Sequence, residues 1–308
     1  MSSESTDAKE LTELLKLPYS VATQSKIAKL LNKGGDPAHN LAAEENFETA
    51  MMFLFLISSK IKGRPMPLNH SLASAVLGKI CVTAMSIQEL FRGHEAGRLK
   101  FLDHSSIAIL CRAIIEASVM YWYLMENVGG EEWQFRLQVM KIHDAASRVR
   151  LFKPMIAETA DRQRSKLETL RNELDKMPLF QKREEKQRIR LRGGELIYVN
   201  GMRSVVGAMN FDEGYYDSVY NYLSAHVHST PISYVNDTDD FEQSFWQRTF
   251  SQYALHHAWI LMIRVGLREV QVSGLRDQFN ADLLTEFCRI AGKKIGASDQ
   301  APDSQPSP

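Results

Sequence analysis

The residues best suited to chemistry lie in the most apolar helix that the sequence predicts. Arg112 and Glu116 are four residues apart in the stretch CRAIIEASVMYWYLME, and they are the only charged residues between His104 and Met125. Positions four apart share one face of a helix, so the two side chains can form an ion pair. Buried charges must be paired, and Glu116 alone cannot satisfy all five donors of a guanidinium. We therefore predict a largely buried pair on which other polar side chains converge.

The segment YYDSVYNYLSAHVHST, residues 215–230, is the best source of those polar side chains. On a helix, Asn221, Ser224 and His228 share one stripe, and His226 lies outside it. The cluster is interpreted either as an acid–base site, because active sites gather titratable groups, or as a polar network that fixes core packing. The structural interpretation is the favoured one. The candidate site residues are Arg112, Glu116, Asn221, His226 and His228.

Motifs that would indicate a known enzyme class or a metal site do not occur in the sequence. There is no H-E-x-x-H, Walker A, G-x-G-x-x-G or G-x-S-x-G pattern. His256 and His257 are adjacent, so they point in different directions and make a poor metal pair. Cys81, Cys111 and Cys288 lie far apart, without C-x-x-C spacing. We expect no cofactor, no metal and no disulfide framework.

The elements that must position these side chains are helices throughout. Pro154 is expected to break or kink the long segment 131–176, and residues 194–202 fit either a short strand or a loop. We predict an all-α fold, a single multi-helix bundle with little or no β-structure. The helical periodicity predicts helices over 20–33, 41–61, 71–91, 105–127, 131–176, 179–192, 212–227, 241–272 and 277–294.

Three segments are expected along the chain. Residues 1–35 form an N-terminal helical segment, and 36–295 form the helical-bundle domain, with a basic helical arm at about 148–192. The tail, 296–308, is rich in proline and serine and nearly free of apolar side chains, so we expect it to be disordered.

Charge is balanced over the chain but not locally. The 37 lysine and arginine residues equal the 37 aspartate and glutamate residues, so no global field favours nucleic acid or an anionic membrane. Residues 148–192 carry 14 basic and 7 acidic residues, whereas 204–247 carry 7 acidic and no basic residues. The favoured interpretation is two solvated segments that pack together. The alternative is a basic arm that follows phosphates, although it lacks the interleaved aromatic residues that stack single-stranded bases.

The sequence shows no targeting signal or convincing membrane span. The start, MSSESTDAKE, has neither a basic region nor an apolar one. Residues 105–125 are long enough to span a bilayer, but Arg112 and Glu116 would each cost roughly 2.5–3.5 kcal/mol at its centre. We therefore expect a buried soluble helix, a cytoplasmic protein with reduced cysteines, and no membrane partner.

The helix with Arg112-x-x-x-Glu116 and the later stretch YNYLSAHVHS resemble a bacterial helical family catalogued as domain of unknown function 5677. In that family an Arg-x-x-x-Glu helix recurs with a later Tyr/Ser…His segment. The resemblance covers about residues 50–270. It implies an all-helical fold and no established activity.

A more distant similarity is to HEPN-type helical domains, many of which are ribonucleases of toxin and defence systems. Their signature is an arginine, a polar residue and, a few residues later, a histidine. Here Asn221 stands where that arginine would be, with six residues between it and His228. No lysine or arginine occurs between 204 and 247, so Arg112 would have to supply the guanidinium from another helix.

Two functions therefore stay open. The favoured one is a non-catalytic interaction or scaffold protein with a structural Arg–Glu–His cluster. The alternative is a HEPN-like ribonuclease in which His228 or His226 is the acid–base group and Arg112 stabilises phosphate charge. A partner, either protein or RNA, would bind through the basic arm 148–192, and a homo-oligomer is compatible with either function.

Overall fold

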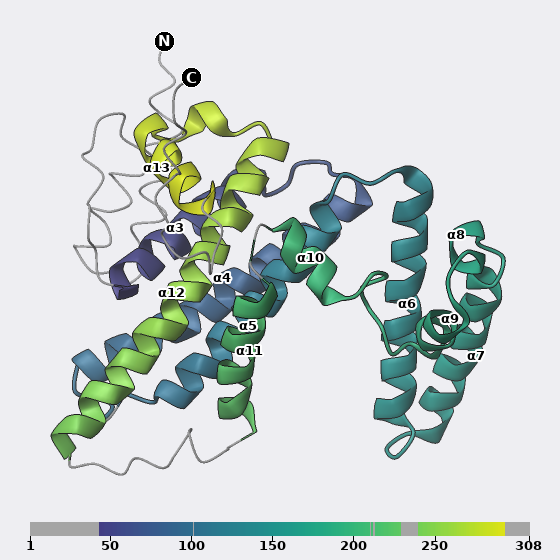
Figure 1. Cartoon of the computed structure of the whole chain (residues 1–308), viewed down its shortest axis with the longest axis horizontal. Coiled ribbons are helices and arrows are strands. Elements are labelled where there is room, and N and C mark those ends of the chain that lie inside the picture. The colour runs from purple at the N-terminus through teal and green to yellow at the C-terminus, as the bar shows by residue number, and fades with distance from the viewer. Residues whose placement is uncertain (1–42, 101, 210, 212, 229–239, 293–308) are drawn as a thin grey trace, which may run out of the picture. The chain divides into compact units, whose positions relative to one another are not determined.

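The computed structural model describes residues 43–100, 102–209, 211, 213–228 and 240–292 (Figure 1). The all-α prediction is confirmed, because helices dominate and no strand or sheet occurs in these ranges. The predicted N-terminal helical segment 1–35 and the predicted tail 296–308 lie outside the described residues.

The chain divides into two compact units. The first unit combines Met1–Leu124 with Met209–Pro308, and the second is Met125–Ala208. The domain expected over 36–295 thus includes residues of both units, and the predicted basic arm lies inside the second.

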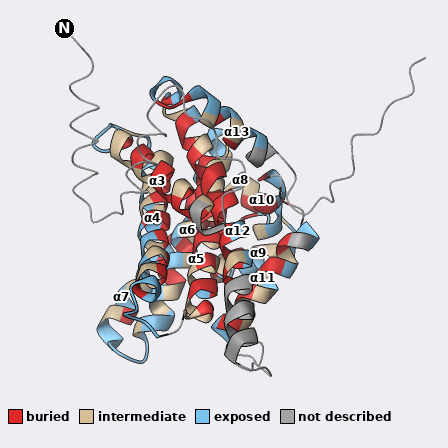
Figure 2. Ribbon diagram, turned by 90° about the vertical axis from the view of Figure 1, so that its left-hand side faces the viewer, coloured by how far each residue is buried: buried red, intermediate tan, exposed pale blue. Residues whose placement is uncertain are grey.

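The first unit contains seven helical elements in its described part, and their buried side chains form its core (Figure 2). Helix α3 packs on both α4 and α12, and α13 packs on α12. The run MMFLFLI at 51–57 is buried at every position except the half-buried Phe55, as expected for the centre of a core. The elements are α3 (Ala43–Ile61), α4 (Leu68–Glu95), α5 (His104–Met125), α11 (Glu213–Val227), α12 (Asp240–Val272), the 3₁₀ helix η2 (Arg276–Gln278) and α13 (Ala281–Gly292).

Two described helices, α4 and α5, are long and apolar enough to cross a membrane by length and composition alone. This is weak evidence, because core helices of soluble proteins meet the same criterion. Most of α5 is buried inside the first unit, which fits a core helix.

The second unit is built on a helical hairpin (Figure 1). Helices α6 and α7 pack along each other, and the short helices α8 and α9 cover α6. The predicted break of 131–176 at Pro154 is confirmed, because α6 ends at Phe152 and α7 begins at Ala157. The elements are α6 (Gly130–Phe152), α7 (Ala157–Leu174), α8 (Pro178–Gln181), α9 (Glu185–Gly193) and α10 (Met202–Ala208).

The stretch after α9 is a loop rather than a strand. Gly194 ends the helix with a φ of 71°, a left-handed conformation that favours glycine. The loop then leads to α10, a helix that the sequence did not predict. Its seven residues, MRSVVGA, include two β-branched residues and a glycine, so their intrinsic helix propensity is low.

Candidate functional site

The centre of the candidate site is a hydrogen-bonded triangle between α5 and α11. Nε of Arg112 donates to Oε1 of Glu116 at 2.9 Å, and Nη2 of Arg112 donates to the hydroxyl of Tyr220 at 2.6 Å. The same hydroxyl donates to Oε1 of Glu116 at 2.9 Å. The guanidinium carbon also lies 4.5 Å from the centroid of the Tyr220 ring, within cation–π range. We call these three residues the Arg–Glu–Tyr cluster.

Each charge in the cluster is balanced by a neighbour. Partial burial alone would lower the pKa of Arg112, but the hydrogen bonds and charges of Glu116 and Tyr220 outweigh it and raise that pKa. Burial, together with the hydrogen bond to Glu116, raises the pKa of Tyr220. At neutral pH the guanidinium of Arg112 therefore stays charged and the phenol of Tyr220 stays neutral.

The expectation of a largely buried pair is right for only one partner. The Arg112 side chain is 19% exposed, whereas that of Glu116 is 44% exposed. The pair therefore sits at the rim of the core, where water reaches the carboxylate. Removing one partner should therefore cost less than it would in a fully buried ion pair, because water can solvate the charge that remains.

His226 occupies a separate, buried position on α11. It is 3% exposed, and its Nδ1 lies 3.2 Å from Oγ of Ser105 at the start of α5. Its ring meets those of His104 and Tyr222 edge to face, at centroid distances of 5.5 and 5.0 Å. Its Nε2 is buried and has no hydrogen-bond partner among the described residues. Burial, helped by the neighbouring His104, lowers the pKa of His226, so the ring is neutral at pH 7.

Asn221 and His228 do not join either group. Both are exposed. Within the described ranges, no hydrogen bond links either side chain to the other candidate residues. The structure thus brings Arg112 and Glu116 together and places His226 in a neighbouring cluster on the same pair of helices.

Tyr220 is the site residue that the sequence interpretation missed. It lies four residues before Ser224, so it belongs to the stripe that contains Asn221 and Ser224. The sequence feature that could have identified Tyr220 is its hydroxyl, which can accept a hydrogen bond from Arg112, because the guanidinium needs more acceptors than Glu116 provides. The contacts of Tyr220 with Arg112 and of His226 with Ser105 also show that α5 and α11 run antiparallel.

A further row of aromatic side chains continues from His226 to α12. The ring of Tyr253 lies 5.4 Å from that of Tyr222 and 4.5 Å from that of His257. His257 is fully buried. Burial, and secondarily the neighbouring His256, lowers the pKa of His257 to about 3. It is therefore a neutral core histidine.

The described residues form no cluster suited to a metal ion, and the two buried cysteines are not activated thiols. No group of three His, Cys, Asp or Glu side chains there could hold a metal ion. Cys81 and Cys111 are buried free thiols. Burial raises the pKa of Cys81 to about 12 and also raises that of Cys111, so neither is a thiolate at neutral pH.

Replacing Tyr220 with phenylalanine is expected to lower the free energy of unfolding by about 1–2 kcal/mol. The ring stays beside Arg112, but the hydroxyl that joins Arg112 to Glu116 is lost. Urea denaturation followed by circular dichroism measures the change. The matched control is Asn221→Ala at the next, exposed position, where we expect less than about 0.5 kcal/mol. Equal effects at the two positions would show that the triangle does not fasten α11.

One comparison with known proteins found a family that matches this chain. The family of unknown function DUF5677 matches residues 70–245, a range that includes Arg112, Glu116 and Tyr220. Searches of curated proteins and of solved structures found no match. Because the match covers more than half of the 308 residues, this chain belongs to the family of unknown function DUF5677.

Proposed function

We propose that this chain is a non-catalytic interaction or scaffold protein in which the Arg–Glu–Tyr cluster fastens α11 to α5. The supporting observation is the closed triangle itself. A nuclease arginine must offer its charge to the negative charge that develops on a phosphate. Here Glu116 already supplies an opposite charge 2.9 Å from Nε of Arg112, and Tyr220 occupies Nη2.

The turn between α6 and α7 is the surface that best fits a partner. Leu151, Met155 and Ile156 are 58%, 69% and 50% exposed, and all three lie within six residues. Contiguous exposed apolar side chains are typical of interaction sites. Arg150 and Lys153 lie beside them in the sequence, and both are exposed. We call Arg150–Ile156 the hairpin tip, and its chemistry favours a partner that presents carboxylates next to apolar side chains.

A protein partner fits the basic arm better than RNA does. Many of its arginines are engaged within the second unit: Arg148 with Asp144, Arg164 with Asp161, Arg171 with Glu168 and Arg192 with Asp175, at 2.5 to 3.2 Å. A phosphate would have to displace these carboxylates. The excess of basic residues is therefore partly compensated inside the unit, which weakens its attraction for a polyanion.

A cytoplasmic location is part of the same proposal. Cys81 and Cys111 are free thiols, as expected in a reducing compartment. Most of α5, one of the two helices with membrane-like composition, is buried in the first unit.

The alternative function is a HEPN-like ribonuclease. One observation favours it, since the Arg–Glu–Tyr cluster is open to solvent on the side of Glu116. In addition, Nη1 of Arg112 makes no hydrogen bond to the described residues and could meet a phosphate. His228 is exposed and would be the acid–base group, because His226 is buried.

The interaction surface is tested by placing a photo-crosslinking amino acid at Met155 of the full chain in cells of the source organism. We expect one discrete adduct, lost when Leu151 and Ile156 are changed to serine and weakened by Lys153→Glu. The matched control is Ile189→Ser on α9, because Ile189 is 62% exposed but lies outside the hairpin tip. An adduct that survives the tip substitutions, or is lost with Ile189→Ser, would contradict an interface at the tip.

A further inference from the structure

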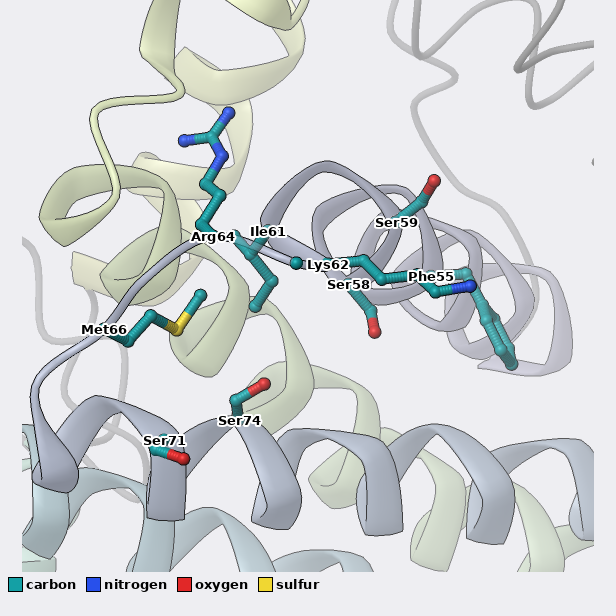
Figure 3. Close-up of a pocket in the computed structure, with 10 residues that line it drawn as sticks. Phe55, Ser58, Ser59, Ile61, Lys62, Arg64, Met66, Ser71 and Ser74 are labelled. Carbon is teal, nitrogen blue, oxygen red and sulfur yellow. The ribbon is translucent and has the colours of Figure 1, made fainter.

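A pocket of about 560 Å³ opens between the end of α3, the loop after it and the first turns of α4 (Figure 3). Figure 3 shows Ser58 of α3 and Ser74 of α4 pointing into this space from opposite sides, and Met66 entering it from the loop. The volume lies within the range of small-molecule sites. The pocket is formed within the first unit, and none of its lining residues belongs to the Arg–Glu–Tyr cluster.

The polar lining of the pocket suits an anion. Four of the ten lining residues are serines, Lys62 and Arg64 are cationic, and none is acidic. Serine hydroxyls and an ammonium group donate hydrogen bonds, and such donors without a competing carboxylate favour a negatively charged acceptor.

The two cationic residues, Arg64 and Lys62, differ in whether their charged group is available to a ligand. Arg64 turns away from α4 in Figure 3, and its Nη1 donates to the backbone oxygen of Ser273 at 3.3 Å. It adds positive charge near the pocket and ties the loop to the end of α12. The ammonium of Lys62 makes no ion pair within the described ranges, and its side chain extends along α3 toward Phe55 (Figure 3). Lys62 is therefore the cation available to a ligand.

The apolar residues that line the pocket indicate that its ligand also has an apolar part. Phe55, Ile61 and Met66 add apolar surface to the same space. A ligand that covers this surface gains hydrophobic stabilisation that a bare inorganic anion cannot gain. We propose that the pocket binds a small organic anion with an apolar body, whose anionic group meets Lys62 and the serine hydroxyls. This site does not depend on the proposed interaction function.

The test titrates the full chain with two fluorescent probes that share one ring system. 1-Anilinonaphthalene-8-sulfonate carries a sulfonate, and N-phenyl-1-naphthylamine does not. We expect saturable binding of the sulfonate probe, weakened about tenfold by Lys62→Glu, which replaces an attractive charge with a repulsive one. Binding of the neutral probe should change by less than about twofold.

Two further variants complete the design. Ser58→Leu combined with Ser74→Leu fills the pocket and should abolish binding of both probes. Lys79→Glu on α4 is the matched control, because Lys79 is exposed but does not line the pocket, and it should leave both affinities unchanged. Circular dichroism verifies that each variant is folded. The proposal is overturned if the sulfonate probe fails to saturate, if Lys62→Glu affects both probes equally, or if filling the pocket leaves binding intact.

Discussion

Replacing Gly266 with alanine is expected to lower the free energy of unfolding by about 1–3 kcal/mol, although alanine is the better helix former. A Cβ atom at Gly266 in α12 would lie 2.5 Å from Cε1 of Phe53 and 3.1 Å from Cδ2 of Leu54, both in α3. Phe53 is fully buried, and its ring lies 5.3 Å from that of Phe279 and 5.0 Å from that of Phe287. The ring cannot move without displacing its neighbours, so the two helices must separate.

The matched control for Gly266 is the same substitution at Gly78 in α4. A Cβ at Gly78 would meet no atom within 4 Å. Alanine there should raise the free energy of unfolding by about 0.5–1 kcal/mol, because the unfolded chain loses conformational freedom and the helix gains propensity. Urea denaturation of the two variants should therefore give shifts of opposite sign. Shifts of the same sign would mean that α3 and α12 are not in close contact at Gly266.

Mild acid is expected to destabilise the protein before its carboxylates begin to protonate. The pKa of His257 is about 3 in the folded chain and returns toward its ordinary value of 6.5 on unfolding. Between these values the unfolded chain binds a proton that the folded chain does not. The contribution of neutral His257 to the free energy of unfolding is therefore complete above pH 6.5. Below that pH it is lost by up to roughly 1.4 kcal/mol per pH unit. His104 and His226, whose pKa values burial also lowers, act in the same direction.

Urea midpoints recorded from about pH 8 to about pH 5, above the range in which most carboxylates protonate, measure this effect. His257→Gln removes the titrating ring and should flatten the decline. His94→Gln, at an exposed position near the end of α4, is the matched control and should leave the slope unchanged. A midpoint that is constant down to about pH 5 would show that the buried histidines do not stay neutral in the folded chain.

Much of the fold could be predicted from the sequence because the signals were local. Pro154 lies in the turn that separates α6 from α7, and Gly194 adopts the left-handed conformation that ends α9. The apolar stretch around Arg112 predicted a core helix, and α5 is one. The short helix α10 was missed because tertiary packing, rather than local propensity, must stabilise its seven residues.

The site was harder to predict than the fold. Helical periodicity shows which residues share one face of a helix, but it does not show which face packs against a neighbouring helix. Tyr216, Val219 and Leu223 are buried, and the sequence favours the apolar Val227 as the next residue of their stripe, although His226 also fits helical spacing. The structure buries His226 and exposes Val227. For the same reason the exposure of Glu116 could not be read from its apolar neighbours in the sequence.

The ion pairs of the basic segment 148–192 could not be read from its net charge. From net charge alone, residues 148–192 are interpreted as a solvated segment beside the acidic segment 204–247, or as an arm that follows phosphates. Several of these arginines pair with carboxylates one helical turn away inside the second unit, such as Arg148 with Asp144. Such local pairs follow from spacings of three and four residues, which a count of net charge does not reveal.

Incubation of the purified full chain with labelled single-stranded RNA is the measurement that most directly separates a structural cluster from a catalytic one. The structural interpretation predicts no cleavage above the level of the His228→Ala and Arg112→Ala variants. It also predicts no saturable binding below about 1 µM at physiological salt. The contradicting result is cleavage that both variants abolish, together with sub-micromolar binding that is lost when Arg188, Arg190 and Arg192 are changed to glutamate.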